Sequence, residues 1–141
     1  MQVFTSSGPK ETKEIGRDLV RKFGEDQLFC LFGPLAAGKT TLVKGIAREL
    51  RIAEKIVSPS YVLLREYEGA CRLFHLDLFR IQSSSEFLEA GLEEYLIRKE
   101  GVVAIEWAGR IEEILPEERV DVELELTDES QRRIEVASQL D

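Results

Sequence analysis

Hydrophobic residues follow two spacings along this chain, one typical of helices and one typical of strands. Apolar residues recur at helical spacing over Thr12–Phe23 and Lys39–Leu50, so each segment is predicted to form an amphipathic helix. Continuous apolar runs at Leu28–Phe32 and Val102–Ile105 indicate strands that are buried on both faces. Because such strands alternate with helices, the pattern predicts a parallel core sheet with right-handed crossovers.

The remaining segments predict two antiparallel hairpins and a further helix. The strand-like runs Tyr61–Tyr67 and Arg72–Phe79 are joined by a short loop that contains glycine. The runs Arg119–Leu126 and Arg132–Ala137 alternate apolar and polar residues, which is expected of two strands at the edge of the sheet. Between the hairpins, a serine-rich cap precedes a helical stretch over residues 83–98.

A phosphate-binding pattern occupies residues 33–41, whose sequence is Gly-Pro-Leu-Ala-Ala-Gly-Lys-Thr-Thr. It matches G-x-x-x-x-G-K-[ST] and lies between a predicted strand and a predicted helix, the context in which this pattern forms a site. Its glycines let successive backbone N–H groups turn toward one anion. Lys39 supplies a cation for the β- and γ-phosphates, and the Thr40 hydroxyl supplies a Mg²⁺ ligand. The residues expected at the nucleotide are Gly33, Ala36, Ala37, Gly38, Lys39, Thr40 and Thr41.

The fold class expected for residues 1–141 is α/β, a single-domain P-loop NTPase. Its sheet should be mixed and mainly parallel, with helices on both faces and antiparallel hairpin additions. A chain of 141 residues is long enough to bury a core without disulfides or metals. ATP or ADP with Mg²⁺ are the ligands that the phosphate loop predicts.

Two acidic residues are candidates for metal binding or catalysis beside the phosphate loop. A nucleotide-bound Mg²⁺ needs an acid, usually at the carboxyl end of a strand near the loop. Glu106 ends an apolar run and is assigned to the metal. Asp77 is assigned to the metal's water shell or the attacking water, so the predicted catalytic set is Lys39, Asp77 and Glu106. His75 lies on the same strand face as Asp77 but is more typical of a core residue than of a catalyst.

The net charge and the cysteine content limit which binding partners and which cellular compartment are expected. The chain has 27 acidic and 19 basic residues and a net charge of −8. The electrostatic field of this negative charge repels nucleic acid, so we do not expect the chain alone to bind DNA or RNA. A basic protein partner is expected instead. Some of the basic residues cluster over Lys39–Lys55. Cys30 and Cys71, both in apolar segments, indicate core thiols of a cytoplasmic protein, and no segment is apolar enough for a membrane.

Several short motifs follow one another between Thr12 and Trp107. After the phosphate loop come Ser58-Pro59-Ser60-Tyr61, His75-Leu-Asp77-Leu-Phe79-Arg80, Gly91-Leu-x-Glu94-Tyr95 and Ile105-Glu106-Trp107. This ordered set resembles the TsaE (YjeE) family, small bacterial ATPases of tRNA N6-threonylcarbamoyladenosine (t6A) synthesis. The sequence departs from the family pattern at Ala36, where glycine is frequent and where a Cβ restricts the loop's dihedral angles. Pro34, Ser60 and Phe79 are smaller departures.

The resemblance implies a slow ATPase that acts as a nucleotide-driven switch on a core of two proteins, TsaB and TsaD. The core would hold the tRNA, so the chain would meet tRNA only through that complex. The resemblance also implies that Thr40 and Glu106 hold Mg²⁺ and that Asp77 supports hydrolysis. The positions implied to be switch-like or partner-sensing are Ser58, Pro59, Ser60, Tyr61, His75, Arg80 and Trp107.

Three other functions remain open at this point. A small-molecule P-loop kinase would need an acceptor pocket and arginines near the γ-phosphate, a role in which Arg80 could serve. A GTP-dependent switch would need a guanine-binding motif, and the one candidate, Thr127–Ser130, has no lysine. A nucleotide-binding assembly protein would differ from an ATPase only in its hydrolysis rate.

Overall fold

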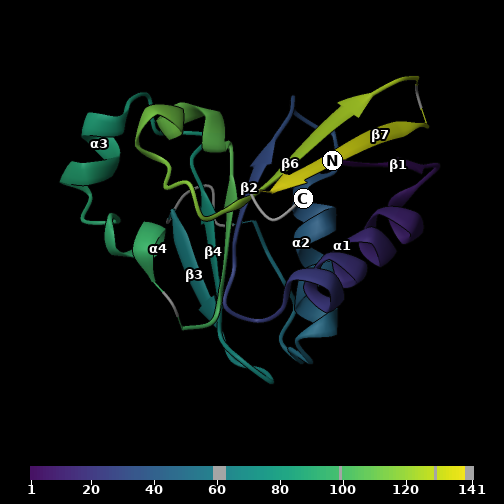
Figure 1. The fold of residues 1–141 in the computed structure, drawn as a ribbon, viewed down its shortest axis with the longest axis horizontal. Helices are drawn as coiled ribbons and strands as arrows, with labels where there is room; N and C mark the ends of the chain where they lie inside the picture. The colour runs from purple at the N-terminus through teal and green to yellow at the C-terminus, as the bar shows by residue number, and fades with distance from the viewer. Residues whose placement is uncertain (59–62, 99, 129, 139–141) are drawn as a thin grey trace.

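A mixed sheet of seven strands runs through the computed structural model, which describes residues 1–58, 63–98, 100–128 and 130–138 (Figure 1). The strands are β1 (Gln2–Ser6), β2 (Leu28–Phe32), β3 (Leu64–Tyr67), β4 (Leu73–Asp77), β5 (Val102–Glu106), β6 (Val120–Leu126) and β7 (Arg132–Ser138). Their order is β1-β7-β6-β2-β5-β4-β3. The four strands β6, β2, β5 and β4 are parallel, and the remaining pairs are antiparallel. The predicted mixed sheet with a parallel centre is confirmed.

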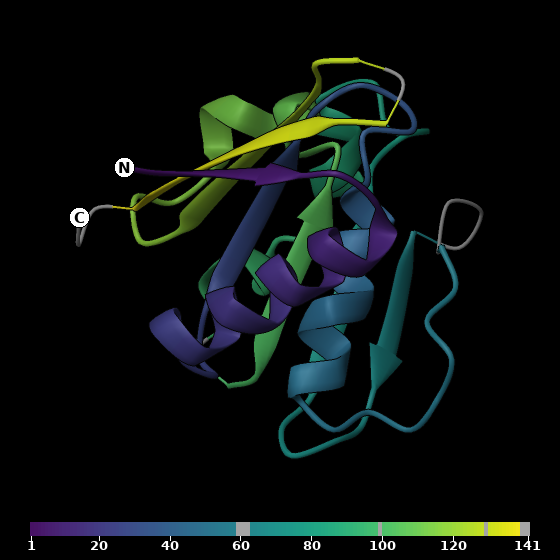
Figure 2. The same ribbon diagram turned by 90° about the vertical axis from the view of Figure 1, so that its right-hand side faces the viewer.

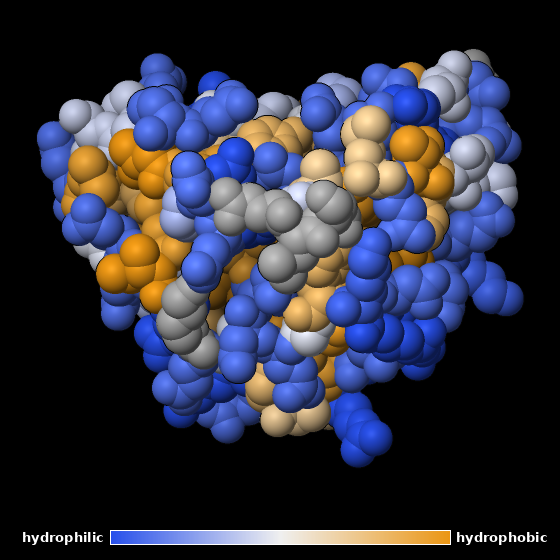
Figure 3. All heavy atoms as spheres, viewed as in Figure 1, coloured by the Kyte–Doolittle hydropathy of each residue, from blue (hydrophilic) through white to orange (hydrophobic). Residues whose placement is uncertain are grey.

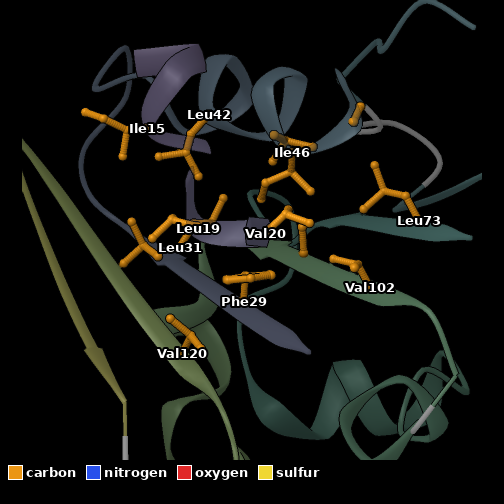
Figure 4. Close-up of a cluster of buried hydrophobic side chains, with 14 of the residues drawn as sticks. Ile15, Leu19, Val20, Phe29, Leu31, Leu42, Ile46, Leu73, Val102 and Val120 are labelled. Carbon is orange, nitrogen blue, oxygen red and sulfur yellow. The ribbon is translucent and has the colours of Figure 1, made fainter. Parts of the chain in front are cut away.

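Helices cover both faces of this sheet (Figure 1). On one side lie α1 (Pro9–Phe23) and α2 (Lys39–Glu49), and on the other lie α3 (Ser84–Glu89), α4 (Glu94–Ile97) and the 3-10 helix η1 (Ala108–Ile114). Helices α1 and α2 approach so closely that a Cβ added at Gly45 would lie 2.0 Å from the Lys13 carbonyl oxygen. Side chains from both helices and from the central strands form a buried hydrophobic cluster between them (Figure 4). This packing fixes the position of α2 on the sheet.

The register of the parallel strands brings three segments to one edge of the sheet. Strand β2 lies between β6 and β5, and Leu31 near its end pairs with Glu106, the last residue of β5. Asp77, the last residue of β4, pairs with Glu106 in turn. Since ligands of parallel sheets bind beyond the carboxyl ends of the strands, the loop after β2 and both acids lie where a ligand is expected.

The N-terminal segment forms a strand that the hydrophobic pattern did not predict. Strand β1 pairs with β7, and the two run side by side in Figure 2. The prediction that Arg119–Leu126 and Arg132–Ala137 form the sheet edge was therefore wrong, because β1 covers β7 and β6 pairs with β2. The pattern of β1, Gln-Val-Phe-Thr-Ser, has too few buried positions to distinguish a strand from a loop.

Other predicted boundaries differ from the structure. The helical stretch predicted over residues 83–98 is two short helices, because Gly91 between them takes a φ of 77°, which no helix continues. Cys30 is buried in β2, but Cys71 is half-buried in the turn before β4 and is not a strand residue. The first residues of the predicted strand Tyr61–Tyr67 and the end of the predicted turn Ile56–Ser60 lie outside the described residues.

The visible outer surface is largely hydrophilic, with separate hydrophobic patches (Figure 3). Among the described residues, no helix is both long enough and apolar enough to cross a membrane.

Candidate nucleotide-binding site

The predicted phosphate loop follows β2 and leads directly into α2, which begins at Lys39. Gly33 takes a φ of 143°, and a Cβ there would lie 2.3 Å from the carbonyl oxygen of Leu124 on β6. Gly38, with a φ of 106°, precedes the helix in a left-handed conformation. Both positions therefore require glycine, and the predicted order of strand, loop and helix is confirmed.

Ala36 is the strained position of the loop. Its φ of 65° lies in the left-handed region, which costs a residue with a Cβ about 1 kcal/mol or more. The departure from the family pattern noted in the sequence thus falls where glycine would be unstrained. A guanidinium N–H of Arg132, at the start of β7, donates to the Ala36 carbonyl oxygen at 3.4 Å.

The amino group of Lys39 is held inside the loop. It donates to the carbonyl oxygens of Gly33 and Pro34 at 2.6 and 2.7 Å. It also lies 4.0 Å from the centre of the Trp107 ring, a cation–π distance. Burial lowers the pKa of Lys39, while the charges of Glu106 and Asp77 oppose that shift. The amino group thus lies at the phosphate loop, and its contact with phosphates stays a prediction.

Glu106 joins the phosphate loop to the buried histidine. The Thr40 hydroxyl lies 2.9 and 2.8 Å from the two Glu106 carboxylate oxygens. On the other side, Nε2 of His75 lies 2.6 Å from Oε2 of Glu106. His75 is fully buried, which agrees with its interpretation as a core residue, yet it contacts a site carboxylate. Its Nδ1 is buried without a hydrogen-bond partner in the described parts of the chain.

Asp77 connects the site to two neighbouring segments. One carboxylate oxygen accepts from the Ser58 hydroxyl at 3.0 Å, and the other accepts from the backbone N–H of Phe79 at 3.0 Å. Asp77 is itself almost completely buried. The Ser58 contact joins the acid to the segment that follows α2.

Trp107 forms the wall beside Lys39. Its φ of 60° turns the chain sharply after Glu106, at the start of η1. Its ring lies 5.2 Å from that of Phe79, and the Arg110 guanidinium lies 5.3 Å from its centre. The side chain thus forms part of the surface of the site.

A cavity of about 400 Å³ lies between these groups. Its lining includes Lys39, Thr40 and Thr41 of the phosphate loop and helix, Ser58, Asp77 and Glu106 on one side, and Arg80 and Trp107. The predicted residues Pro59, Ser60 and Tyr61 lie outside the described part of the chain. Leu35, Phe79 and Arg132 also line the cavity and were not predicted as site residues. Only the strand order places Arg132, at the start of β7, beside the loop.

The oxygen donors of the site fit Mg²⁺. The Thr40 hydroxyl and the Glu106 carboxylate are hard oxygen ligands that already lie together, and Mg²⁺ typically takes one or two protein carboxylates with phosphate oxygens and waters. No group of three or more histidine, cysteine or acidic side chains able to hold a metal occurs among the described residues.

The amino-acid sequence as a whole matches a known protein family. The family described as threonylcarbamoyl adenosine biosynthesis protein TsaE matches residues 6–134 of the chain. The chain belongs to the TsaE family. A family member from Treponema pallidum, named tRNA threonylcarbamoyladenosine biosynthesis protein TsaE, is 38% identical over 94% of this chain and 97% of its own length. One of the same name from Bacillus subtilis is 38% identical over 89% of this chain and 78% of its own length.

A solved structure extends the TsaE family match to the fold. The crystal structure of YdiB from Bacillus subtilis matches with a TM-score of 0.75 and 32% sequence identity. The match covers 94% of this chain and 82% of the YdiB chain. The resemblance found in the motifs is thus confirmed over nearly the whole length.

Proposed function

We propose that this chain binds and hydrolyses ATP with Mg²⁺, and that its nucleotide state controls TsaB and TsaD homologues during t6A synthesis. The TsaE family carries the name of tRNA threonylcarbamoyladenosine biosynthesis, and the chain is one of its members. The observation that carries the ATPase proposal is the contact between Thr40 and Glu106 at 2.8 Å, in the cavity that Lys39 also lines.

The phosphate loop and Lys39 perform the binding step. The amino group of Lys39, which donates to two loop carbonyl oxygens, would contact the β- and γ-phosphates. Backbone N–H groups at the start of α2 face the same phosphates. Thr40 and Glu106 would hold Mg²⁺, which supplies charge neutralisation to the phosphate oxygens. Buried surroundings strengthen each of these electrostatic contacts relative to water.

Asp77 acts on the attacking water. Its carboxylate accepts a hydrogen bond from the water and aligns the water oxygen with the γ-phosphorus. A bond forms between that oxygen and the phosphorus while the bond from phosphorus to the β–γ bridging oxygen breaks, which gives ADP and phosphate. The buried position of Asp77 beside Glu106 supports this role.

The Ser58 contact supplies a route from the nucleotide to the surface. When Asp77 turns toward the attacking water, it releases or shifts the Ser58 hydroxyl that it now holds at 3.0 Å. The preceding residue, Val57, is 50% exposed, and its backbone N–H is hydrogen bonded to the buried Tyr67 hydroxyl at 3.3 Å. A change in the Ser58 contact would therefore alter the chain next to the exposed Val57, while Val57 itself stays anchored to the Tyr67 hydroxyl.

The test is ATP turnover by the purified chain, alone and with its TsaB and TsaD homologues. We expect Mg²⁺-dependent release of phosphate that the two proteins accelerate, and t6A formation on tRNA that requires wild-type chain. Substitution Asp77→Asn, which keeps the size of the side chain, should abolish both. Transfer of the γ-phosphate to a small molecule instead of water would show that the chain is a kinase and would contradict the proposal.

A further inference from the structure

A second cavity lies at the edge of the sheet opposite the phosphate loop. It has a volume of about 220 Å³, and its lining includes the first residues of two parallel strands, Leu28 of β2 and Val120 of β6. The phosphate loop follows Phe32 at the other end of β2, about 13 Å away at a rise of about 3.3 Å per strand residue. Among the described residues, none lines both cavities. The second cavity is therefore a place separate from the nucleotide site.

Apolar side chains from four elements form one wall of this cavity. They are Phe23 at the end of α1, Leu28, Leu96 of α4 and Val120. Leu28, Leu96 and Val120 are buried, and Phe23 is half-buried. An aliphatic group that enters the cavity would contact these side chains and lose its own contact with water, which is favourable.

Arg98 brings an incompletely paired cation to the cavity. Its side chain is 26% exposed, and its guanidinium group lies 4.3 Å from the centre of the Phe74 ring. In the described parts of the chain, its Nε is buried without a hydrogen-bond partner, and its Nη1 lies 3.6 Å from the exposed carboxylate of Glu94. A buried N–H group without an acceptor is unfavourable, so a carboxylate that reaches Arg98 would satisfy a donor that the fold leaves unpaired.

Arg119 brings a second cation, which is held in a fixed orientation. Its Nε donates to the Asp121 carboxylate at 2.8 Å, and its Nη1 donates to the Pro116 carbonyl oxygen at 2.7 Å. These two contacts fix the plane of the guanidinium group and use neither N–H of Nη2. The side chain is 24% exposed, so both arginines are largely removed from water.

Two carboxylates, those of Asp26 and Glu118, also line the cavity, and both side chains belong to exposed residues. Oδ1 of Asp26 accepts a hydrogen bond from the backbone N–H of Gly101 at 3.3 Å, which restrains the carboxylate. In addition, α1 ends at Phe23, and the carbonyl end of a helix carries partial negative charge. The lining thus combines two guanidinium groups with two carboxylates, so a simple anion or a simple cation would meet repulsion as well as attraction.

We infer that this cavity binds a free α-amino acid with an aliphatic side chain, such as leucine. The carboxylate of the amino acid would face Arg98 and Arg119, its ammonium group would face Asp26 and Glu118, and its side chain would contact the apolar wall. The volume is that of about seven water molecules, which suits one amino acid rather than a peptide or a nucleotide. The inference does not depend on the proposed nucleotide binding.

The experiment is a titration of the full, isotope-labelled chain with leucine, followed through its backbone amide signals in NMR spectra. Saturable shifts should appear at residues that line the cavity, such as Gln27 and Val120, and not in the phosphate loop. Leucinamide lacks the carboxylate, and N-acetyl-leucine lacks the ammonium group. Each analogue should bind about tenfold more weakly than leucine, as expected when one charged hydrogen-bonding group is lost.

Two substitutions assign the charged contacts to residues. Arg98→Met keeps an unbranched side chain but removes the guanidinium group, so it should weaken leucine binding about tenfold and leave leucinamide binding unchanged. Asp26→Asn keeps an acceptor for the Gly101 N–H but removes the charge, so it should weaken leucine binding and leave N-acetyl-leucine binding unchanged. The matched control is Arg65→Met, since Arg65 is an exposed residue of β3 that does not line the cavity.

Four results would overturn the inference. One is the absence of saturable shifts with leucine at about 10 mM, a concentration that detects any Kd near 1 mM. Another is a set of shifts confined to the phosphate loop. A third is equal affinity for leucine and either analogue, which would show that the missing charge makes no contact. The fourth is an equal loss of leucine and leucinamide binding in Arg98→Met, which would show that Arg98 shapes the cavity without contacting a carboxylate.

Discussion

His75 and Glu106 form a buried pair behind the phosphate loop, with Nε2 of the histidine 2.6 Å from Oε2 of the glutamate. Because an ionised carboxylate only accepts hydrogen bonds, Nε2 is the donor, and the contact fixes the carboxylate that Thr40 meets from the other side. The histidine therefore orients a predicted metal ligand from outside the cavity, an arrangement common around metal sites.

Replacement of His75 tests this orientation. His75→Phe conserves most of the volume but leaves the Glu106 carboxylate without its buried donor, which should lower the free energy of unfolding by about 1–3 kcal/mol. The concentration of Mg²⁺ needed for half-maximal ATP hydrolysis should rise. Urea unfolding and a Mg²⁺ titration measure the two effects. A variant that loses stability but keeps the wild-type Mg²⁺ requirement would show that His75 only fills the core.

Lys39→Ala should weaken ATP binding by about 2–4 kcal/mol, because it removes the buried cation that faces the phosphates. The matched control is Lys44→Ala, a lysine on the same helix that does not line the nucleotide cavity. Calorimetry with Mg-ATP measures both variants. Unchanged affinity in Lys39→Ala would refute the assignment of this loop to phosphate.

The lowered pKa of Lys39 also predicts a pH effect on stability. The folded chain releases this proton at a lower pH than the unfolded chain, whose lysine keeps it until about pH 10.5. Between these two pKa values the unfolded state binds more protons, so this residue makes stability rise with pH in that interval. Lys39→Met removes the titrating group. Denaturant unfolding of both proteins between pH 8 and about 10.5 should show a more positive slope for wild type.

The central part of the fold was predictable because its signals are local. The buried runs at β2 and β5 are short and apolar, and the phosphate-loop pattern between β2 and α2 indicates a strand before it and a helix after it. Glu106 could be placed at the loop because parallel neighbouring strands end at the same edge. Strand β1 could not be predicted, since its stability comes from pairing with β7 at the far end of the sequence.

Arg132 could not be predicted as a cavity residue for the same reason, because its position depends on strand pairing. Arg132 lies almost a hundred positions from Ala36, and its sequence neighbours are typical of any exposed strand start. Only the order β7-β6-β2 brings it to the phosphate loop. Ala36, by contrast, was recognisable as an unusual position from the resemblance to the family, in which glycine is frequent there, and its φ of 65° gives the physical reason.

Gly33→Ala should displace the phosphate loop. A Cβ at Gly33 would lie 2.3 Å from the Leu124 carbonyl oxygen, which is backbone and cannot rotate away. The loop must move from β6, so ATP binding should be lost and the midpoint of thermal unfolding should fall. Gly109→Ala is the matched control, because its new Cβ would meet only a Phe32 ring atom at 3.8 Å. A Gly33→Ala variant that binds ATP normally would contradict the close packing of loop and strand.

Asp77→Ala and Glu106→Ala should fail in different ways. Asp77 is assigned to the attacking water, so its loss should abolish hydrolysis while ATP still binds. Glu106 is assigned to Mg²⁺, so its loss should also remove the Mg²⁺ dependence of ATP binding. Single-turnover hydrolysis and calorimetry with and without Mg²⁺ distinguish the two variants. Wild-type hydrolysis by Asp77→Ala would show that another group orients the water.

Partner proteins should set the rate of the proposed ATP hydrolysis. The net charge of −8 opposes direct binding of tRNA and favours a basic protein surface, while Ser58 couples the buried Asp77 to an exposed segment. Purified alone, the chain should hydrolyse ATP slowly, and TsaB with TsaD should raise the rate. Ser58→Ala breaks the coupling contact but leaves Lys39, Thr40 and Glu106 in place, so it should keep ATP affinity and lose much of the stimulation. Steady-state phosphate release with and without the two proteins measures this effect.

Two results would contradict a partner-dependent switch. One is tight tRNA binding by the isolated chain at physiological salt, and the other is rapid hydrolysis that TsaB and TsaD do not change.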